Sequence, residues 1–158
     1  LKKTFYNKSM EQNLWILLQL LIAAFLGSLL GIERAIAGKT AGLRTFALVS
    51  LGSALFIIIS KIANESYLGV TVFDPSRVAS QIIVGIGFLG AGLIIFKESK
   101  VMGLTTAAGL WVSAGIGMAV GFKLYTIAVF ATLLTLFIFT VLWIFEIKLK
   151  KEIKELDF

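Results

Sequence analysis

The sequence has 158 residues, of which 58% are hydrophobic and 15% charged, and its mean hydropathy is +0.96. A soluble domain of this size could not cover so much apolar surface with polar groups, so the lipid bilayer is the expected partner. The absence of cysteine and histidine excludes disulfides, thiol chemistry and imidazole catalysis or metal ligation. The net charge of +6 comes mostly from the ends of apolar runs, which favours contact with anionic lipid and not with nucleic acid.

Five apolar runs follow one another along the chain, each of about the 20 residues that cross the hydrocarbon core of a bilayer. They predict an all-α, polytopic integral membrane protein with five transmembrane helices. Residues 1–13 form a polar flank, residues 14–147 the transmembrane domain and residues 148–158 a charged tail with one or two helical turns. The predicted spans are Leu14–Ile32, Leu43–Ile62, Ser76–Phe96, Leu104–Val120 and Leu124–Ile147.

Glycine is concentrated among bulky apolar residues in the third and fourth spans, which is typical of helices that pack closely in lipid. We expect these two spans at the centre of the bundle and the bulky fifth span on the lipid-exposed side. A GxGxxG pattern in the third span lacks the preceding strand and the acidic partner of a dinucleotide site, so no cofactor is expected. The residues predicted to serve helix packing are Gly27, Gly31, Gly85, Gly87, Gly90, Gly92, Gly117 and Gly121.

Basic residues are divided unequally between the two sides of the predicted membrane domain. The side of the N-terminus carries six and the side of the C-terminus nine, so the positive-inside rule places the N-terminus outside and the C-terminus in the cytoplasm. The six are Lys2, Lys3, Lys8, Lys61, Arg77 and Lys123; the nine are Arg34, Lys39, Arg44, Lys97, Lys100, Lys148, Lys150, Lys151 and Lys154.

A predicted polar cluster lies at the cytoplasmic face, where Glu33, Arg34 and Arg44 flank a short connection between the first two spans. Charges at helix ends can extend to water, and topology alone would place arginines here. The alternative is an ion pair of Glu33 with an arginine that fixes the first two helices, or a cluster that includes Thr105 and Thr106. Those two threonines serve either as a helix cap or as ligand contacts.

A second polar group is predicted at the outer face, from Asp74 and Arg77 to Gln81. Asp74 precedes a proline and reads as a helix cap three residues before Arg77. Gln81 lies about 6 Å deeper along the helix, where a polar side chain faces protein or water. It therefore serves either an interhelical hydrogen bond or a ligand or ion path. No two acidic residues have convincing spacing for magnesium, so no metal site is assigned.

No residues combine into a catalytic site. The sequence offers no nucleophile with a base, no metal cluster and no pair of carboxylates in a predicted cleft. We therefore expect a protein that is not an enzyme.

Five sequence pieces, in order and at compatible spacing between about residues 14 and 122, resemble the membrane domain of the MgtC/SapB family. They are Gly31-Ile32-Glu33-Arg34, Ala41-Gly42-Leu43-Arg44-Thr45, Asp74-Pro75-x-Arg77, Gly85-Ile86-Gly87-Phe88-Leu89-Gly90-Ala91-Gly92 and Val101-x-Gly103-Leu104-Thr105-Thr106-Ala107-Ala108-x-Leu110-Trp111. Longer members carry a cytoplasmic C-terminal domain, whereas this chain has only a short charged tail after Lys148 and is expected to be a short member.

The resemblance implies a multi-pass protein of the bacterial inner membrane, linked to magnesium limitation, acid stress or survival in a host. It implies a regulatory role, in some members restraint of ATP synthase, so the expected partners are further copies of the chain or a membrane protein such as ATP synthase. The alternative is a small oligomeric transporter or channel for Mg²⁺ or another solute, with Arg77 and Gln81 on its path.

Overall fold

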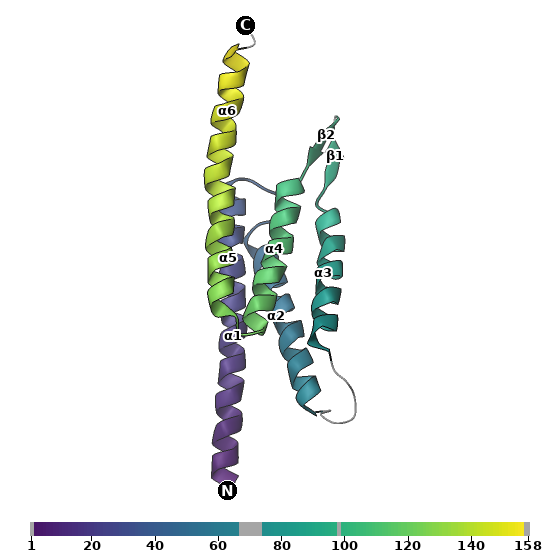
Figure 1. The fold of residues 1–158 in the computed structure, drawn as a ribbon, viewed down its shortest axis with the longest axis vertical. Coiled ribbons are helices and arrows are strands. Elements are labelled where there is room, and N and C mark those ends of the chain that lie inside the picture. The colour runs from purple at the N-terminus through teal and green to yellow at the C-terminus, as the bar shows by residue number, and fades with distance from the viewer. Residues whose placement is uncertain (1, 67–73, 98, 157–158) are drawn as a thin grey trace.

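The computed structural model describes residues 2–66, 74–97 and 99–156, and it is a helical bundle with one small hairpin (Figure 1). The chain alternates in direction from helix to helix, and the two ends of the described chain lie at opposite ends of the molecule. In chain order the elements are α1 (Lys2–Ile36), α2 (Leu43–Ser66), α3 (Pro75–Ala91), β1 (Ile95–Lys97), β2 (Lys100–Met102), α4 (Leu104–Gly121), α5 (Tyr125–Phe137), the π-helical segment η1 (Ile138–Leu142) and α6 (Trp143–Leu156).

Four apolar stretches in this bundle are long enough to cross a membrane: Met10–Ile36, Leu43–Asn64, Leu104–Gly121 and Tyr125–Ile153. The last combines α5, η1 and α6, which continue one another as a single rod in Figure 1. The shorter apolar helix, Ser76–Ala91, supplies the fifth pass. The predicted all-α membrane architecture is therefore confirmed.

The centre of the bundle is α4, which contacts α1, α2, α3 and α5. Its small residues let it pack on several sides at once, as the sequence predicted for the fourth span. The same prediction for the third span is wrong, because α3 lies at the edge and packs chiefly against α4 (Figure 1). Bulky side chains of α1, α2 and α4 form most of the core, among them Leu30, Phe46, Leu110, Ile116 and Val120.

The third helix ends at Ala91, five residues before the predicted end of the span. Its last turn tightens, because the backbone N–H groups of Leu93 and Ile94 donate to carbonyls only three residues earlier. The residues beyond it pair as the antiparallel strands β1 and β2, with Ile95 opposite Met102 and Lys97 opposite Lys100. Gly103 joins β2 to α4 with φ of +89°, and a side chain there would clash with the Leu93 carbonyl. A short β-hairpin thus replaces the last predicted turn of helix.

The two chain ends are also more helical than predicted. Helix α1 begins at Lys2, inside the segment expected to be a polar flank. The charged tail continues helix α6 as far as Leu156, about two and a half turns past Ile147. In both places helix-forming residues extend the helix into polar surroundings.

Two buried hydrogen bonds join α4 to its neighbours. The Gln19 side chain on α1 donates to the Val120 carbonyl at 3.0 Å, and the Ser113 hydroxyl donates to the Phe46 carbonyl of α2 at 3.0 Å. Gln19 is only 2% exposed. A polar group buried within a membrane bundle needs such a partner, so these bonds fix the relative positions of the three helices.

The predicted packing glycines divide into two groups. A methyl group added at Gly27 would lie 2.6 Å from the Phe46 carbonyl oxygen, and one at Gly121 would lie 2.8 Å from Ile57 Cβ. Gly31 and Gly117 face the backbone of α2 equally closely. The glycines of α3 differ: Gly90 and Gly92 have neighbours only at 3.4 Å or more, while Gly85 and Gly87 face open space. Close glycine packing therefore lies where α2 meets α1 and α4.

Candidate functional site

The candidate site lies at the end of the bundle where α1 stops. Gly38 adopts φ of +65°, the Gly38 N–H donates to the Ala35 carbonyl, and the Lys39 N–H donates to the Arg34 carbonyl. These bonds form a Schellman motif, which satisfies the last carbonyls of the helix. The turn places Arg34 in the last helical turn and Lys39 just beyond it, so two cations are fixed close together along the chain.

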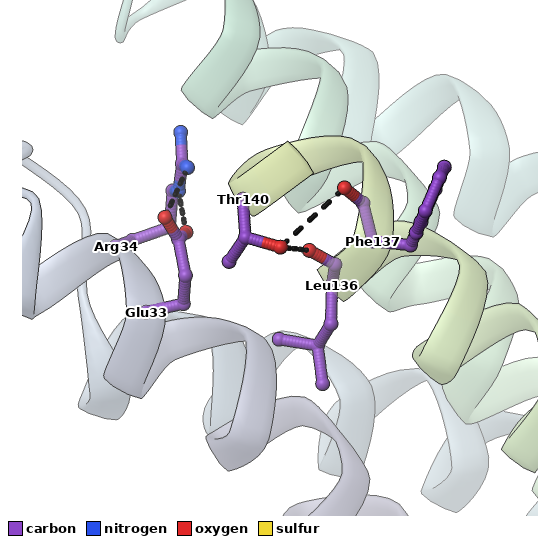
Figure 2. Close-up of polar contacts among 5 residues, drawn as sticks. All are labelled: Glu33, Arg34, Leu136, Phe137 and Thr140. Carbon is purple, nitrogen blue, oxygen red and sulfur yellow. Dashed lines mark hydrogen bonds and ion pairs between the residues drawn. The ribbon is translucent and has the colours of Figure 1, made fainter. Parts of the chain in front are cut away.

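Arg34 is buried, with a residue exposure of 3%. The Glu33 carboxylate accepts from Arg34 Nε and from Arg34 Nη2, the latter at 2.7 Å. The guanidinium carbon lies 3.7 Å from the centroid of the Phe139 ring, which is a cation–π contact. Figure 2 shows the paired Glu33 and Arg34 side chains beside the segment that carries Thr140. The charge is thus compensated on one side by a carboxylate and covered on another by an aromatic face.

The π-helical segment η1 presents Phe139 to Arg34. The Thr140 hydroxyl donates to the Leu136 carbonyl at 2.8 Å and lies 3.5 Å from the Phe137 carbonyl (Figure 2). The Phe139 ring also covers Gly109 of α4, where a side chain would collide with it. A π-turn adds a residue to the helix and changes which side chain faces the neighbouring helices. Here it inserts one ring between α1 and α4.

A cavity of about 420 Å³, called here the Arg34 pocket, opens beside this contact. Its lining combines hydroxyls and charged groups with apolar side chains. Its walls are Arg34, Lys39, Val101, Gly103, Leu104, Thr105, Thr106, Ile138, Phe139, Leu142, Trp143 and Glu146. The structure thus brings together three residues of the predicted cytoplasmic cluster, Arg34, Thr105 and Thr106, with Glu33 paired behind Arg34.

The third charged member of that predicted cluster, Arg44, does not reach the Arg34 pocket. It is exposed and lines a different hollow, of about 750 Å³, called here the α2–α3 groove. Gln81 lines the same groove from α3. Apart from Arg44, Gln81, Thr45 and Ser53 the groove is apolar, and its remaining walls are Leu48, Val49, Gly52, Phe56, Val78, Ile82, Gly85, Ile86 and Leu89.

The residues of the predicted outer group have separate places in the structure, because Asp74 caps α3 and Gln81 lines the α2–α3 groove. Asp74 is the N-cap of α3, and its carboxylate accepts from the Ser76 N–H at 2.9 Å. Hydrogen bonds from Ser76 lower the pKa of Asp74, and the positive charge of Arg77 lowers it further. Asp74 and Arg77 form no ion pair within the described part of the chain. Arg77 and Gln81 are both exposed.

Several residues of the site were missed in the sequence. Phe139, Trp143 and Glu146 lie in a bulky helix with no motif, and Lys39 was counted only for topology.

Outside the Arg34 pocket, the sequence analysis also missed Gln19. It had a detectable signal, since a single amide within an apolar run indicates a partner inside the bundle. Among the described residues, no three acidic, histidine or cysteine side chains gather in a way that could hold a metal ion.

Fold and site together define a polytopic helical membrane protein with a buried cation at one end of the bundle. The chain belongs to the MgtC family, whose sequence pattern it matches over residues 20–147. This is the family that the sequence motifs indicated.

Curated bacterial relatives support this assignment. The Escherichia coli K12 protein named "Putative magnesium transporter YhiD" is 42% identical over 127 residues, which cover 79% of this chain and 59% of the relative. The protein MgtC of Salmonella typhimurium LT2 is 46% identical over 120 residues, which cover 76% of this chain and 49% of the relative. This chain therefore spans about half to three fifths of these relatives. No solved structure matches it.

Proposed function

We propose that this chain is a non-enzymatic regulatory protein of the bacterial inner membrane, with its N-terminus outside and its C-terminus in the cytoplasm. Membership of the MgtC family supports a role in adaptation to magnesium limitation, acid stress or life in a host. The excess of basic residues on the side of the C-terminus and the opposite placement of the two ends support the orientation (Figure 1).

The regulation would act through a helix–helix contact made by α3. Its exposed face carries Gln81 and Gly85, at the edge of the α2–α3 groove, and Val84 and Phe88 beside them at helical spacing. An amide in a membrane helix is costly against lipid, and the open space at Gly85 permits another helix to approach closely. This face is the observation that carries the proposal. Its partner is a second copy of the chain or a membrane protein such as ATP synthase.

Photocrosslinking in native membranes tests this docking face. Phe88 on α3 is 81% exposed and Phe130 on α5 is 67% exposed, so each can be replaced by benzoylphenylalanine with little change in size. We expect protein adducts from position 88, identified by mass as self or partner, and only lipid adducts from position 130. If position 88 also yields only lipid adducts, docking through α3 is wrong.

Transport is the second candidate, because the α2–α3 groove combines a volume of about 750 Å³ with Arg44, Thr45, Ser53 and Gln81 in apolar walls. The name of the Escherichia coli relative refers to magnesium transport. Such a small unit would transport as an oligomer, with Gln81 on the path.

Flux measurements on purified protein in liposomes test this candidate. If the groove conducts Mg²⁺, Gln81→Leu will reduce its uptake at least tenfold, since it removes an oxygen ligand from the path. Gln12→Leu makes the same change at an exposed position outside the groove and should leave uptake unchanged. Native protein that adds no flux to the liposomes would contradict transport.

A further inference from the structure

The first turn of α4 is left without a side-chain cap. Its N-cap residue, Gly103, has no side chain to accept a hydrogen bond. The backbone N–H groups of Leu104, Thr105 and Thr106 come too early in the helix to have acceptors within it. All three residues line the Arg34 pocket, so the positive end of the helix faces this cavity.

Thr106 adds a side-chain hydroxyl that can bond to a polar ligand in the cavity. Its residue exposure is 3%, and its hydroxyl makes no hydrogen bond within the described residues. The other buried threonines, Thr132 and Thr135, donate to carbonyls four residues earlier at 2.8 and 2.7 Å. In the described part of the chain, the fully enclosed hydroxyls without a partner are those of Ser50 and Ser60, so the Thr106 hydroxyl is open to the cavity and can bond to a ligand there.

Two cations also line the Arg34 pocket. Glu33 occupies Nε and Nη2 of Arg34, and Nη1 has no partner among the described residues. Lys39 lines the same pocket and is exposed, so its ammonium can turn toward the cavity. A guanidinium is suited to phosphate oxygens, and lysine adds a mobile point charge. Glu146 also lines the cavity and would weaken, but not cancel, the attraction for an anion.

We propose that the Arg34 pocket binds a phosphate-type oxyanion, held by the first N–H groups of α4, the Thr106 hydroxyl, Arg34 and Lys39. These donors approach from several directions, which fits the three or four oxygens of a phosphate better than the two of a carboxylate. The apolar part of the lining, with Leu142 and Trp143, would contact the organic part of an ester. The phosphate is either the headgroup of an anionic phospholipid or a soluble phosphate.

Trp143 on the pocket wall is a natural reporter of binding. Replacing Trp15 and Trp111, both exposed outside this pocket, by phenylalanine leaves Trp143 as the single tryptophan. Inorganic phosphate titrated at constant ionic strength onto protein in phosphatidylcholine nanodiscs tests the soluble source. Nanodiscs that also contain phosphatidylglycerol test the lipid source. A change in Trp143 emission in either experiment supports the proposal, and the experiment that gives it identifies the source of the phosphate. If the emission changes in neither experiment, the proposal is wrong.

Variants locate the binding. Thr106→Val keeps the volume and removes an unpaired hydroxyl, so it should fold normally and weaken binding about tenfold, or about 1.4 kcal/mol. Lys39→Gln should weaken binding about threefold, and Glu146→Gln should strengthen it by a similar factor. Lys61→Gln, a charge change outside this pocket, is the control. If Thr106→Val and Lys39→Gln both bind like the native chain, the pocket is not the site and the proposal is wrong.

Discussion

Gly117→Ala will lower the free energy of unfolding by about 2 kcal/mol, the usual cost of overfilling a packed interface. An added methyl group at this position would overlap the Ser50 carbonyl of α2. Helix α2 cannot simply move away, because Ser113 of α4 hydrogen-bonds to the Phe46 carbonyl and Gly27 of α1 packs against that same carbonyl. The substitution must therefore separate α2 from α4 or strain all three helices.

The matched control lies two residues away on the same helix. A methyl group added at Gly115 meets nothing within 4 Å, so Gly115→Ala should leave stability unchanged or raise it slightly through better helix propensity. Both proteins are titrated with sodium dodecyl sulfate in mixed micelles, and tryptophan fluorescence follows unfolding. Equal stability of the two variants would show that the α2–α4 contact tolerates expansion and would contradict close packing at Gly117.

These glycines also show which packing contacts could be predicted from the sequence and which could not. The spacing of Gly27 with Gly31 and of Gly117 with Gly121 predicted two close-approach faces, and the structure has close backbone contacts at all four. The partner of both faces is α2, whose only glycine, Gly52, faces open space. Spacing within one helix therefore finds a narrow surface but cannot identify what fills it, because the second surface is made of backbone carbonyls and ordinary side chains.

The third helix shows the reverse case. Its glycines are the densest in the chain, yet Gly85 and Gly87 face open space. Glycine permits a close approach without supplying a partner, and here the α2–α3 groove separates α3 from α2.

The end of α3 was also predicted wrongly. Ile95 and Phe96 are apolar enough to extend a span, and only their pairing with Met102 and Val101 makes them a strand.

The candidate site was only partly predictable. Glu33, Arg34, Thr105 and Thr106 could be placed at one membrane face from the order of the spans. Arg44 lies at the same predicted face, but its helix turns it toward the α2–α3 groove. The ring that covers Arg34 could not be foreseen, because the π-turn at η1 changes the helical register by one residue. The order of the spans therefore predicts at which membrane face a residue lies, but not which neighbouring helix its side chain contacts.

Arg34→Met will destabilise the protein by about 3 kcal/mol, near the lower limit for removing one partner of a buried ion pair. The substitution leaves the half-buried Glu33 carboxylate without its cation and removes the contact with the Phe139 ring. Arg34→Lys should cost less, since it keeps the charge but loses the paired hydrogen bonds to Glu33. Arg44→Met removes an exposed arginine near the same end and should change stability by less than about 0.5 kcal/mol.

The double variant Glu33→Gln/Arg34→Met separates the two causes of the loss. If the uncompensated carboxylate dominates, neutralising Glu33 will restore about half of the stability that Arg34→Met removes, in the same mixed-micelle titration. If nothing is restored, the stabilisation comes from the guanidinium against Phe139, and Phe139→Leu should then reproduce most of the loss. Arg34→Met with native stability would contradict both causes, because a cation buried between a carboxylate and an aromatic ring cannot be removed from this bundle without cost.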